Sequence, residues 1–414
     1  MKTIAGLLCV MMWLGIAVSP ALAQSGLALA SSPASQKTAA KNTLAPNINA
    51  KALWDGRKAV EFHAVSFPRM VKATEAHFLV DEEYVLGITG NGESRAYPTR
   101  FASWHHIIND KIGTKENGGP SFVTVTYCIV CNSGMRFATP EIHHQPLQFD
   151  FYGLYNGVMT LYDKNTESVW LQISGRAVKG PLLDMTLKRG PLLDTTWGAW
   201  KKLHPHTLVM APDPHLAACY EPKGSIMVRG YTEFPADYFR PTLTHRDIRL
   251  PMFASVLAVS LPATENGAAP TGAEEVVRST PAVQRAYPMK TFQKRSGVIN
   301  DTVGVTPVTV LFMADTETMN AVSPVVAGRI LTLEVRKSPQ GKAAFYDKET
   351  GTRWNIEGRA EAGPLLGTDL PRLDSHMSQW YGWVAYFPET TIYGQSDLSI
   401  PAFHRSPSLK IGQR

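Results

Sequence analysis

The feature that most constrains the fold of this chain is an internal repeat. The motif Arg-Ala-Tyr-Pro at residues 95–98 recurs at 285–288, and Tyr-Asp-Lys at 162–164 recurs at 346–348. Further matched pairs, in the same order along the chain, are Asn109 and Asn300, Trp170 and Trp354, Gly180 and Gly363, Trp197 and Trp380, and Trp200 and Trp383. The offset between matched residues varies only between 183 and 191. A kept order with a nearly constant offset indicates duplication of one structural unit.

The repeat predicts the domain organisation. The expected segments are a signal peptide at 1–23, a mobile leader and lead-in at 24–75, a first repeat at 76–210, a connector at 211–277, a second repeat at 278–394 and a tail at 395–414. Residues 265–280 are rich in Gly, Ala, Pro and Thr, which is typical of a linker. Copies of this length can each bury a core.

Within each copy the residue pattern favours strands. Residues 122–127 alternate in the manner of a strand, and 308–311 is the matching segment. Gly90-Asn91-Gly92 and Asp163-Lys-Asn-Thr166 each lie between apolar runs and predict hairpin turns. Two short helices are expected, one after Pro98 and one carrying Trp197 and Trp200. The predicted fold is mainly β, with two tandem homologous barrel-like or coiled-sheet domains related by a pseudo-twofold axis.

The first residues are typical of a secretory signal. Lys2 is followed by an uncharged apolar run from Ile4 to Val18, and small residues stand at Ala21 and Ala23. The apolar run is shorter than the roughly 20 residues of a membrane-spanning helix. We therefore expect cleavage after Ala23 and a periplasmic product without membrane insertion.

The charge of the expected product is modest. Without Lys2 the chain has 40 basic and 35 acidic residues, a net charge of +5, with no basic block. This pattern argues against nucleic acid as the main partner. Motifs typical of phosphate loops, dinucleotide folds, nucleophile elbows and zinc proteases are missing from the sequence, so no nucleotide cofactor is expected. The sequence assigns neither a reaction nor an oligomeric state.

The duplication also serves as an internal control. The second copy lacks the Cys-x-x-Cys pair that is the candidate chemical site of the first copy. Residues present in both copies are therefore expected to stabilise the fold. Asp163 and Asp347 could be taken for acid–base carboxylates, but their shared Asp-x-x-Thr context predicts hairpin turns instead.

Residues found only in the first copy are the candidate site. Cys128 and Cys131 form a Cys-x-x-Cys pair, and Met313 and Thr316 stand at the matching positions of the second copy. His105 and His204 are likewise missing from the second copy. The metal ligands predicted from this comparison are Cys128, Cys131 and His105, with Met135, His204 and Gln172 as possible additions.

Several segments resemble the bacterial domain-of-unknown-function 3179 family. They are Trp104-His-His-Ile-Ile-Asn-Asp110, Thr126-Tyr-Cys-Ile-Val-Cys-Asn-Ser-Gly134, Tyr155-Asn-Gly-Val-Met-Thr-Leu-Tyr-Asp163 and Glu167-Ser-Val-Trp-Leu-Gln172. The resemblance covers most of the mature chain. It departs from the family pattern at Ile129, where the family has Pro, and at His106, where it has Glu. The resemblance implies kinship and no particular activity.

Three functions are open for the cysteine pair. A soft metal ion, copper or zinc, fits thiolate ligands joined by His or Met, although a closed zinc site needs four ligands. A redox-active or structural disulfide fits an oxidising compartment. A ligand pocket in which the cysteines have another role is the third. Cys219 could be a third ligand, but a small buried residue is the simpler interpretation.

Overall fold

The computed structural model describes residues 43–60, 62–224, 230–262, 276–277, 282–338 and 341–396. Within them the chain is mainly β with a few short helices, as predicted. The predicted signal peptide, the leader up to residue 42, most of the linker and nearly all of the tail lie outside the described residues.

Three sheets are built mainly from the first copy. Their strand orders are β17 (Leu193–Thr196), β4 (Tyr84–Gly90), β5 (Glu93–Pro98), β18 (Leu208–Met210), β3 (Met70–Lys72); β16 (Arg189–Gly190), β8 (Ser133–Ala138), β7 (Ser121–Cys128), β6 (Ile107–Ile112), β2 (Val65–Ser66); and β1 (Leu53–Asp55), β11 (Phe149–Tyr155), β12 (Val158–Asp163), β13 (Val169–Leu171), β14 (Ala177–Lys179).

Three further sheets correspond to these in the second copy. Their orders are β31 (Ser375–Gln379), β19 (Ser255–Pro262), β21 (Ala282–Pro288), β32 (Thr391–Ile392); β22 (Gly297–Val303), β23 (Thr306–Met313), β24 (Thr318–Val322); and β27 (Leu333–Lys337), β28 (Ala343–Asp347), β29 (Arg353–Trp354), β30 (Ala360–Ala362). Short two-stranded ribbons join β9 (Glu141–Ile142) to β10 (Gln145–Pro146), β15 (Thr186–Leu187) to β20 (Val276–Val277), and β25 (Val325–Val326) to β26 (Arg329–Ile330).

The matched sheets share their strand order. β18 joins β5 in parallel, and β32 joins β21 in parallel, while the other neighbours in these two sheets are antiparallel. β19 lies inside the segment 211–277 that was expected to be a connector, and it pairs with both β21 and β31. The repeated unit of the structure therefore includes a strand that the sequence matches do not reach.

Turn chemistry explains the hairpins. Asn91 and Gly92 have φ values of 46° and 76°, a left-handed pair that matches the twist of β4 and β5. Between β12 and β13, Asp163 accepts hydrogen bonds from the Thr166 amide at 2.6 Å and from the Trp170 indole at 2.9 Å. Asp347 accepts the Trp354 indole at the same distance. The prediction that both aspartates close turns is confirmed.

Among the described residues, three short α-helices follow strands. They are α2 (Thr99–His105), α3 (Trp197–Leu203) and α4 (Trp380–Val384), and a 3-10 turn, η6 (Met289–Phe292), takes the place of α2 in the second copy. The two predicted helices are α2 and α3. The helix α4 carries Trp380 and Trp383, the partners of Trp197 and Trp200 in the repeat.

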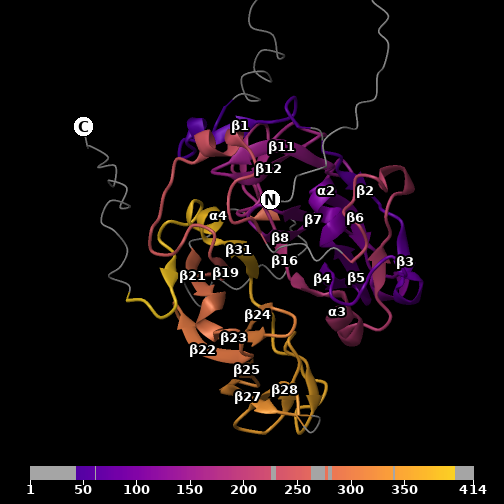
Figure 1. Ribbon diagram of the computed structural model, residues 1–414, viewed down its shortest axis with the longest axis vertical. Helices are drawn as coiled ribbons and strands as arrows, with labels where there is room; N and C mark the ends of the chain where they lie inside the picture. Colours follow the sequence, from indigo (N-terminus) through magenta and orange to yellow (C-terminus); the bar gives the residue numbers. More distant parts are fainter. Residues whose placement is uncertain are drawn as a thin grey trace, which may run out of the picture.

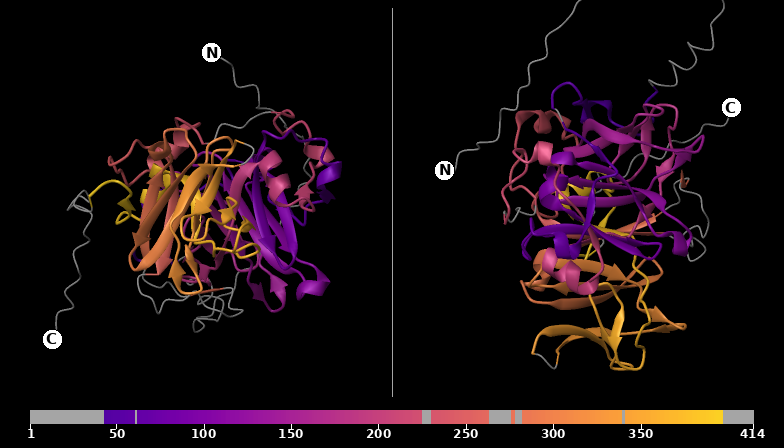
Figure 2. Two further views of the ribbon diagram at one scale, coloured as in Figure 1. Left: turned by 90° about the horizontal axis from the view of Figure 1, so that it is seen from below. Right: turned by 90° about the vertical axis from the view of Figure 1, so that its right-hand side faces the viewer.

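The two copies build two of their hydrophobic cores jointly. Trp380 and Trp383 of the second copy pack in a cluster with Trp170 of the first, and Trp197 and Trp200 of the first pack with Trp354 of the second. The expectation of two tandem domains is therefore not confirmed, because the Trp-bearing helix of each copy packs into the core of the other. Figure 1 shows the first copy, in indigo and magenta, above β22 to β28 of the second copy, while α4 and β31 of the second copy lie at the level of β8. Figure 2 shows the sheets stacked along the long axis.

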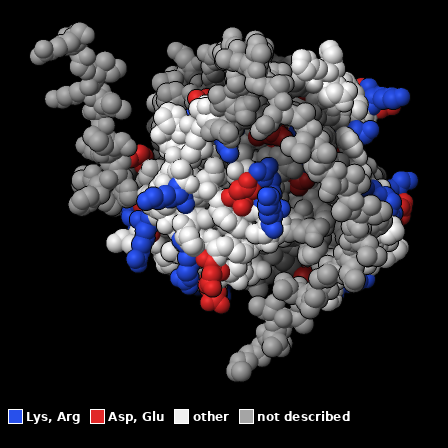
Figure 3. All heavy atoms as spheres, turned by 90° about the horizontal axis from the view of Figure 1, so that it is seen from above, with Lys and Arg blue, Asp and Glu red and all other residues white. Residues whose placement is uncertain are grey.

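On the face shown in Figure 3, basic and acidic side chains are interspersed. This agrees with a charge that is scattered along the sequence. Among the described residues, no helix is long and apolar enough to cross a membrane.

Candidate thiol site

The cysteine pair lies on the β7–β8 hairpin. Cys128 is the last residue of β7 and pairs across the hairpin with Ser133. Cys131 lies in the connecting turn, where Asn132 has a φ of 48°. The Tyr127 hydroxyl donates to the Asn132 side chain at 3.0 Å and holds this turn in place. The strand that ends at Cys128 was predicted from the alternation of residues 122–127.

Both thiols are free and buried, with Cys128 4% exposed and Cys131 fully covered. The Cys131 Sγ lies 3.4 Å from the Ser133 hydroxyl and 3.9 Å from the Cys128 carbonyl oxygen. A buried polar pair of this kind is stabilised only if its hydrogen bonds are satisfied.

The two thiols differ in acidity. The hydrogen bond from the Cys131 thiol is the largest cause that lowers the pKa of Cys128, and backbone N–H groups of Met159, Cys131 and Val130 add to it against the effect of burial. Burial, followed by the neighbouring Cys128, raises the pKa of Cys131 well above its ordinary value. Of the two thiols, Cys128 is therefore the more acidic, and Cys131 is the one that holds its proton more tightly.

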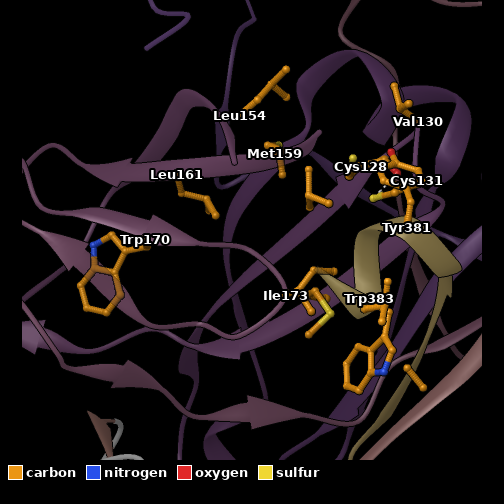
Figure 4. Close-up of a cluster of buried hydrophobic side chains, with 14 of the residues drawn as sticks. Cys128, Val130, Cys131, Leu154, Met159, Leu161, Trp170, Ile173, Tyr381 and Trp383 are labelled. Atoms are coloured by element: carbon orange, nitrogen blue, oxygen red, sulfur yellow. Dashed lines mark hydrogen bonds between the residues drawn. The ribbon is translucent and has the colours of Figure 1, made fainter. Parts of the chain in front are cut away.

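The second copy forms one wall of this site. The Gln379 amide donates to the Cys131 carbonyl at 2.8 Å, and the Ser133 hydroxyl donates to the Ser378 hydroxyl at 2.9 Å. A Cβ atom built on Gly382 would lie 3.2 Å from the Cys131 Cβ, so α4 packs directly on the cysteine turn. Figure 4 shows Tyr381 next to Cys131 and Cys128 at this contact.

The same place in the second copy has a different set of side chains. Met313 pairs with Thr318 as Cys128 pairs with Ser133, which supports the sequence match of Met313 to Cys128. The Thr316 hydroxyl lies 2.8 Å from that of Thr318, and Thr318 lies 2.7 Å from Thr195 of the first copy. The hydroxyl contact between copies is thus kept, while both sulfurs are replaced.

His105 has other partners than the cysteines. Its Nδ1 lies 2.7 Å from the His63 carbonyl oxygen, and its Nε2 lies 2.7 Å from the Tyr220 hydroxyl. With both ring nitrogens engaged at the end of α2, the residue anchors two segments that flank the first copy. Its proposed role as a metal ligand has no support from this geometry.

His204 is also placed elsewhere. Its Nε2 lies 2.7 Å from a carboxylate oxygen of Glu357, which in turn forms an ion pair with Arg372. His204 therefore links α3 to the second copy.

Met135 and Gln172 lie nearer to the pair. Met135 is buried in the same hydrophobic cluster as the cysteines. The Gln172 amide donates to the Thr126 hydroxyl at 3.0 Å and to the Ser133 carbonyl at 2.9 Å. Gln172 thus supports the backbone of the cysteine hairpin.

Within the part of the chain that the structure describes, no group of three or more His, Cys, Asp or Glu side chains is arranged to hold a metal ion. Cys219, partly exposed, lies after a short turn at Pro214–Leu216 and outside the cluster that contains the pair. A hollow of about 450 Å³ lies against β22 and β23, among Asn300, Pro307 and Ile330. Neither cysteine lines it, so it is not a ligand pocket of the cysteine pair.

Tyr381 and Ser378 lie at the cysteine site but are not among the residues unique to the first copy, so the sequence comparison did not identify them. Both belong to the second copy, on α4 and β31. The opposite comparison contains a signal for Tyr381, because Gly198 stands at its place in the first copy. Residues gained by the second copy would have indicated which side chains face the cysteines.

Fold and site together define a mainly β protein with a duplicated unit and a buried dithiol at the junction of its two copies. The chain belongs to the DUF3179 family, described as a protein family of unknown function, whose model matches residues 61–390. No curated protein and no solved structure matched the chain.

Proposed function

We propose that Cys128 and Cys131 form a reversible dithiol–disulfide couple in an exported protein. The observation that carries the proposal is the placement of two free thiols on one hairpin turn, where the Cys131 thiol and backbone amides lower the pKa of Cys128. A low-pKa thiol beside a second, protonated thiol is the arrangement that thiol–disulfide exchange uses.

The exchange runs in two balanced steps. The Cys128 thiolate attacks one sulfur of a disulfide in the substrate, forms a mixed disulfide and releases the other sulfur as a thiolate. Cys131 then loses its proton and attacks the Cys128 sulfur, which forms the internal disulfide and releases the second substrate thiolate. The proton lost by Cys131 goes to one released thiolate and water protonates the other, so the substrate disulfide is reduced to two thiols while the cysteine pair is oxidised. The reverse sequence oxidises a substrate dithiol.

A soft metal ion held by the pair is the alternative proposal. Zinc sites use three or four protein ligands, and the described residues supply only two neighbouring thiols, with His105 and His204 engaged elsewhere. Copper(I) is the softer choice for two thiolates. A non-catalytic ligand-binding module is the remaining alternative, and in it the two thiols would not cycle between dithiol and disulfide.

One sample distinguishes these functions. The mature protein is purified from the periplasm without reductant, and free thiols and bound copper and zinc are measured on it. It is then equilibrated with mixtures of reduced and oxidised glutathione, quenched in acid and unfolded, and its thiols are counted by alkylation. We expect a reversible transition between dithiol and disulfide, with less than one metal ion per chain.

Substitutions of single cysteines by serine show which thiols undergo the transition. Cys128→Ser and Cys131→Ser should each abolish it, while Cys219→Ser should leave it intact, because Cys219 lies outside the cluster of the pair. Stoichiometric copper or zinc that both serine variants lose would support the metal site instead. A pair that never changes oxidation state and holds no metal would overturn both proposals.

A further inference from the structure

A groove on the second copy lies where the first copy is covered by its own chain. It is the hollow of about 450 Å³ along β22, and residues 300–302, 307–308, 324 and 330–332 line it. Among the described residues, β22 is an edge strand whose one pairing neighbour in its sheet is β23. The unpaired backbone groups of an edge strand are a template for a further strand.

The first copy shows which kind of segment fits this edge. There β2 pairs in parallel with β6, and Ser66 lies opposite Asn109. The Asn109 side-chain amide donates to the Ser66 hydroxyl at 3.4 Å, and the Phe67 amide donates to the Asn109 carbonyl at 2.7 Å. The ring of Phe67 lies against that of Phe122, with 6.3 Å between their centres. With β2 in place, Asn109 is only 3% exposed.

The second copy has the same supporting residues without the covering segment. Asn109 donates its side-chain amide to the Phe149 carbonyl at 2.9 Å. Asn300 makes the equivalent bond to the Leu333 carbonyl at 2.8 Å. Pro307 stands at the register position of Phe122. Asn300, however, is exposed, in contrast to its buried counterpart.

One segment beyond the described residues has the sequence pattern of the covering segment. Residues 65–68 read Val-Ser-Phe-Pro, and residues 398–401 read Leu-Ser-Ile-Pro, so both have an apolar residue, Ser, an apolar residue and Pro. The same pattern at 259–262 is already paired with β21 as part of β19. Residues 398–401 are therefore the candidate for the uncovered edge.

The chain enters this segment close to the groove. Arg285 donates to the Thr391 hydroxyl of β32 at 3.1 Å and to the carboxylate of Asp301, which lines the groove, at 2.8 Å. Leu398 follows Thr391 by seven residues. An extended chain of that length spans about 23 Å. Residues 398–401 can thus reach β22 of their own chain.

We propose that residues 398–401 add to the edge of β22 in the same chain as a parallel strand and fill the groove. In the register of β2, Ser399 lies opposite Asn300 and accepts a hydrogen bond from its side-chain amide, which has a second hydrogen to donate. The Ile400 amide donates to the Asn300 carbonyl, and the Ile400 side chain packs on Pro307. Main-chain bonds and alternate side chains hold the segment, as in other strand additions. The proposal goes beyond the dithiol function, because neither cysteine lines the groove.

The test is amide hydrogen exchange of residues 297–303 in the full mature chain, with residues 107–112 as an internal reference that β2 covers in every variant. The double variant Leu398→Asp/Ile400→Asp should speed exchange at Asn300 about tenfold, the loss expected for one strand-pairing hydrogen bond. Ser408→Asp, which lies in the same tail outside the pattern, is the matched control and should leave exchange at Asn300 unchanged.

Ile330→Asp tests the groove independently of the tail. Ile330 is 60% exposed and lines the groove, so its replacement should displace residues 398–401 without unfolding the protein. Exchange at Asn300 should again be faster. Leu366→Asp is the control, because Leu366 is 67% exposed and lies outside the groove.

The outcomes are distinct. Slow exchange at Asn300 that persists on dilution and is lost in both the tail variant and the groove variant supports the proposal. Exchange at Asn300 that is the same in the wild type and in Leu398→Asp/Ile400→Asp overturns it. Slow exchange that is lost on dilution, as a dimer dissociates, places the segment of a second copy in the groove and also overturns it.

Discussion

Trp170 donates its indole N–H to a carboxylate oxygen of Asp163 at 2.9 Å, and both side chains are completely buried. The second copy repeats this contact between Trp354 and Asp347 at the same distance. The aspartate is present in both the copy with the cysteines and the copy without them, and in each copy it binds a turn amide and a tryptophan indole. The relationship explains why the Tyr-Asp-Lys motif is duplicated.

Asp163→Ala should destabilise the protein by about 2 to 4 kcal/mol, because it leaves the Trp170 indole and the turn amides without their charged acceptor. Asp347→Ala should have a similar effect. The midpoint of denaturant unfolding measures both. Asp369→Ala is the control, since this exposed partner of Arg359 should change stability by less than about 1 kcal/mol. Equal midpoints for Asp163→Ala and Asp369→Ala would contradict the assignment.

A fragment of residues 43–254 should fail to fold cooperatively. It contains the first copy but lacks Trp380 and Trp383, which fill the cluster around Trp170. Circular dichroism during denaturant unfolding should show no sigmoidal transition for the fragment, in contrast to the full mature chain. A fragment that unfolds cooperatively with a native-like m value would show that the first copy folds around its own hydrophobic core without the second copy.

Stability should fall as the pH drops from about 6.5 to about 4. Burial lowers the pKa of His106 from 6.5 to about 4, so the unfolded chain binds a proton in this range that the folded chain does not. The shift corresponds to about 3 kcal/mol lost by pH 4. Burial lowers the pKa of His376 to about 3, which extends the loss to that pH. Unfolding midpoints across this pH range measure the slope.

His106→Asn should flatten that slope. Asn tolerates the positive φ of 58° at this position and has no proton to bind. His143→Asn is a matched control, because His143 has a φ of 52° and is exposed. The assignment fails if the two variants have the same pH slope as the wild type.

His105→Phe should lower stability by about 1 to 3 kcal/mol through loss of its contacts with the His63 carbonyl and the Tyr220 hydroxyl. Tyr220→Phe, which removes one of the two contacts, should cost less. Neither variant should change the glutathione equilibrium of the cysteine pair or its copper or zinc content. A metal content that falls in His105→Phe but not in Tyr220→Phe would restore His105 as a ligand.

The mature protein is predicted to begin at Gln24. Intact mass of the periplasmic product measures this start directly. A mass that retains Met1, or a membrane fraction that resists salt and carbonate, would refute export with cleavage after Ala23.

Much of the local structure could be predicted from the sequence. Asn91-Gly92 predicts a hairpin because its residues accept left-handed backbone, and alternation over 122–127 predicts β7 because strand side chains alternate between two faces. The sequence matches did not identify β19, because Val256-Leu257 lies 171 positions after its counterpart Val85-Leu86, outside the offset of the other matches. Its pairing with β21 and β31 shows the equivalence.

The sequence alone establishes the duplication, because matched residues recur in the same order in both copies. It also establishes the mainly β fold and the strand that ends at Cys128, since strands depend on residues close together in the chain. What surrounds the cysteine pair depends on the tertiary structure. Ser133 meets Ser378 across 245 positions, and His105 meets Tyr220 rather than a sulfur. The physical reason is that such contacts depend on how two sheets and a helix pack, and the spacing of residues along a chain contains no record of that packing.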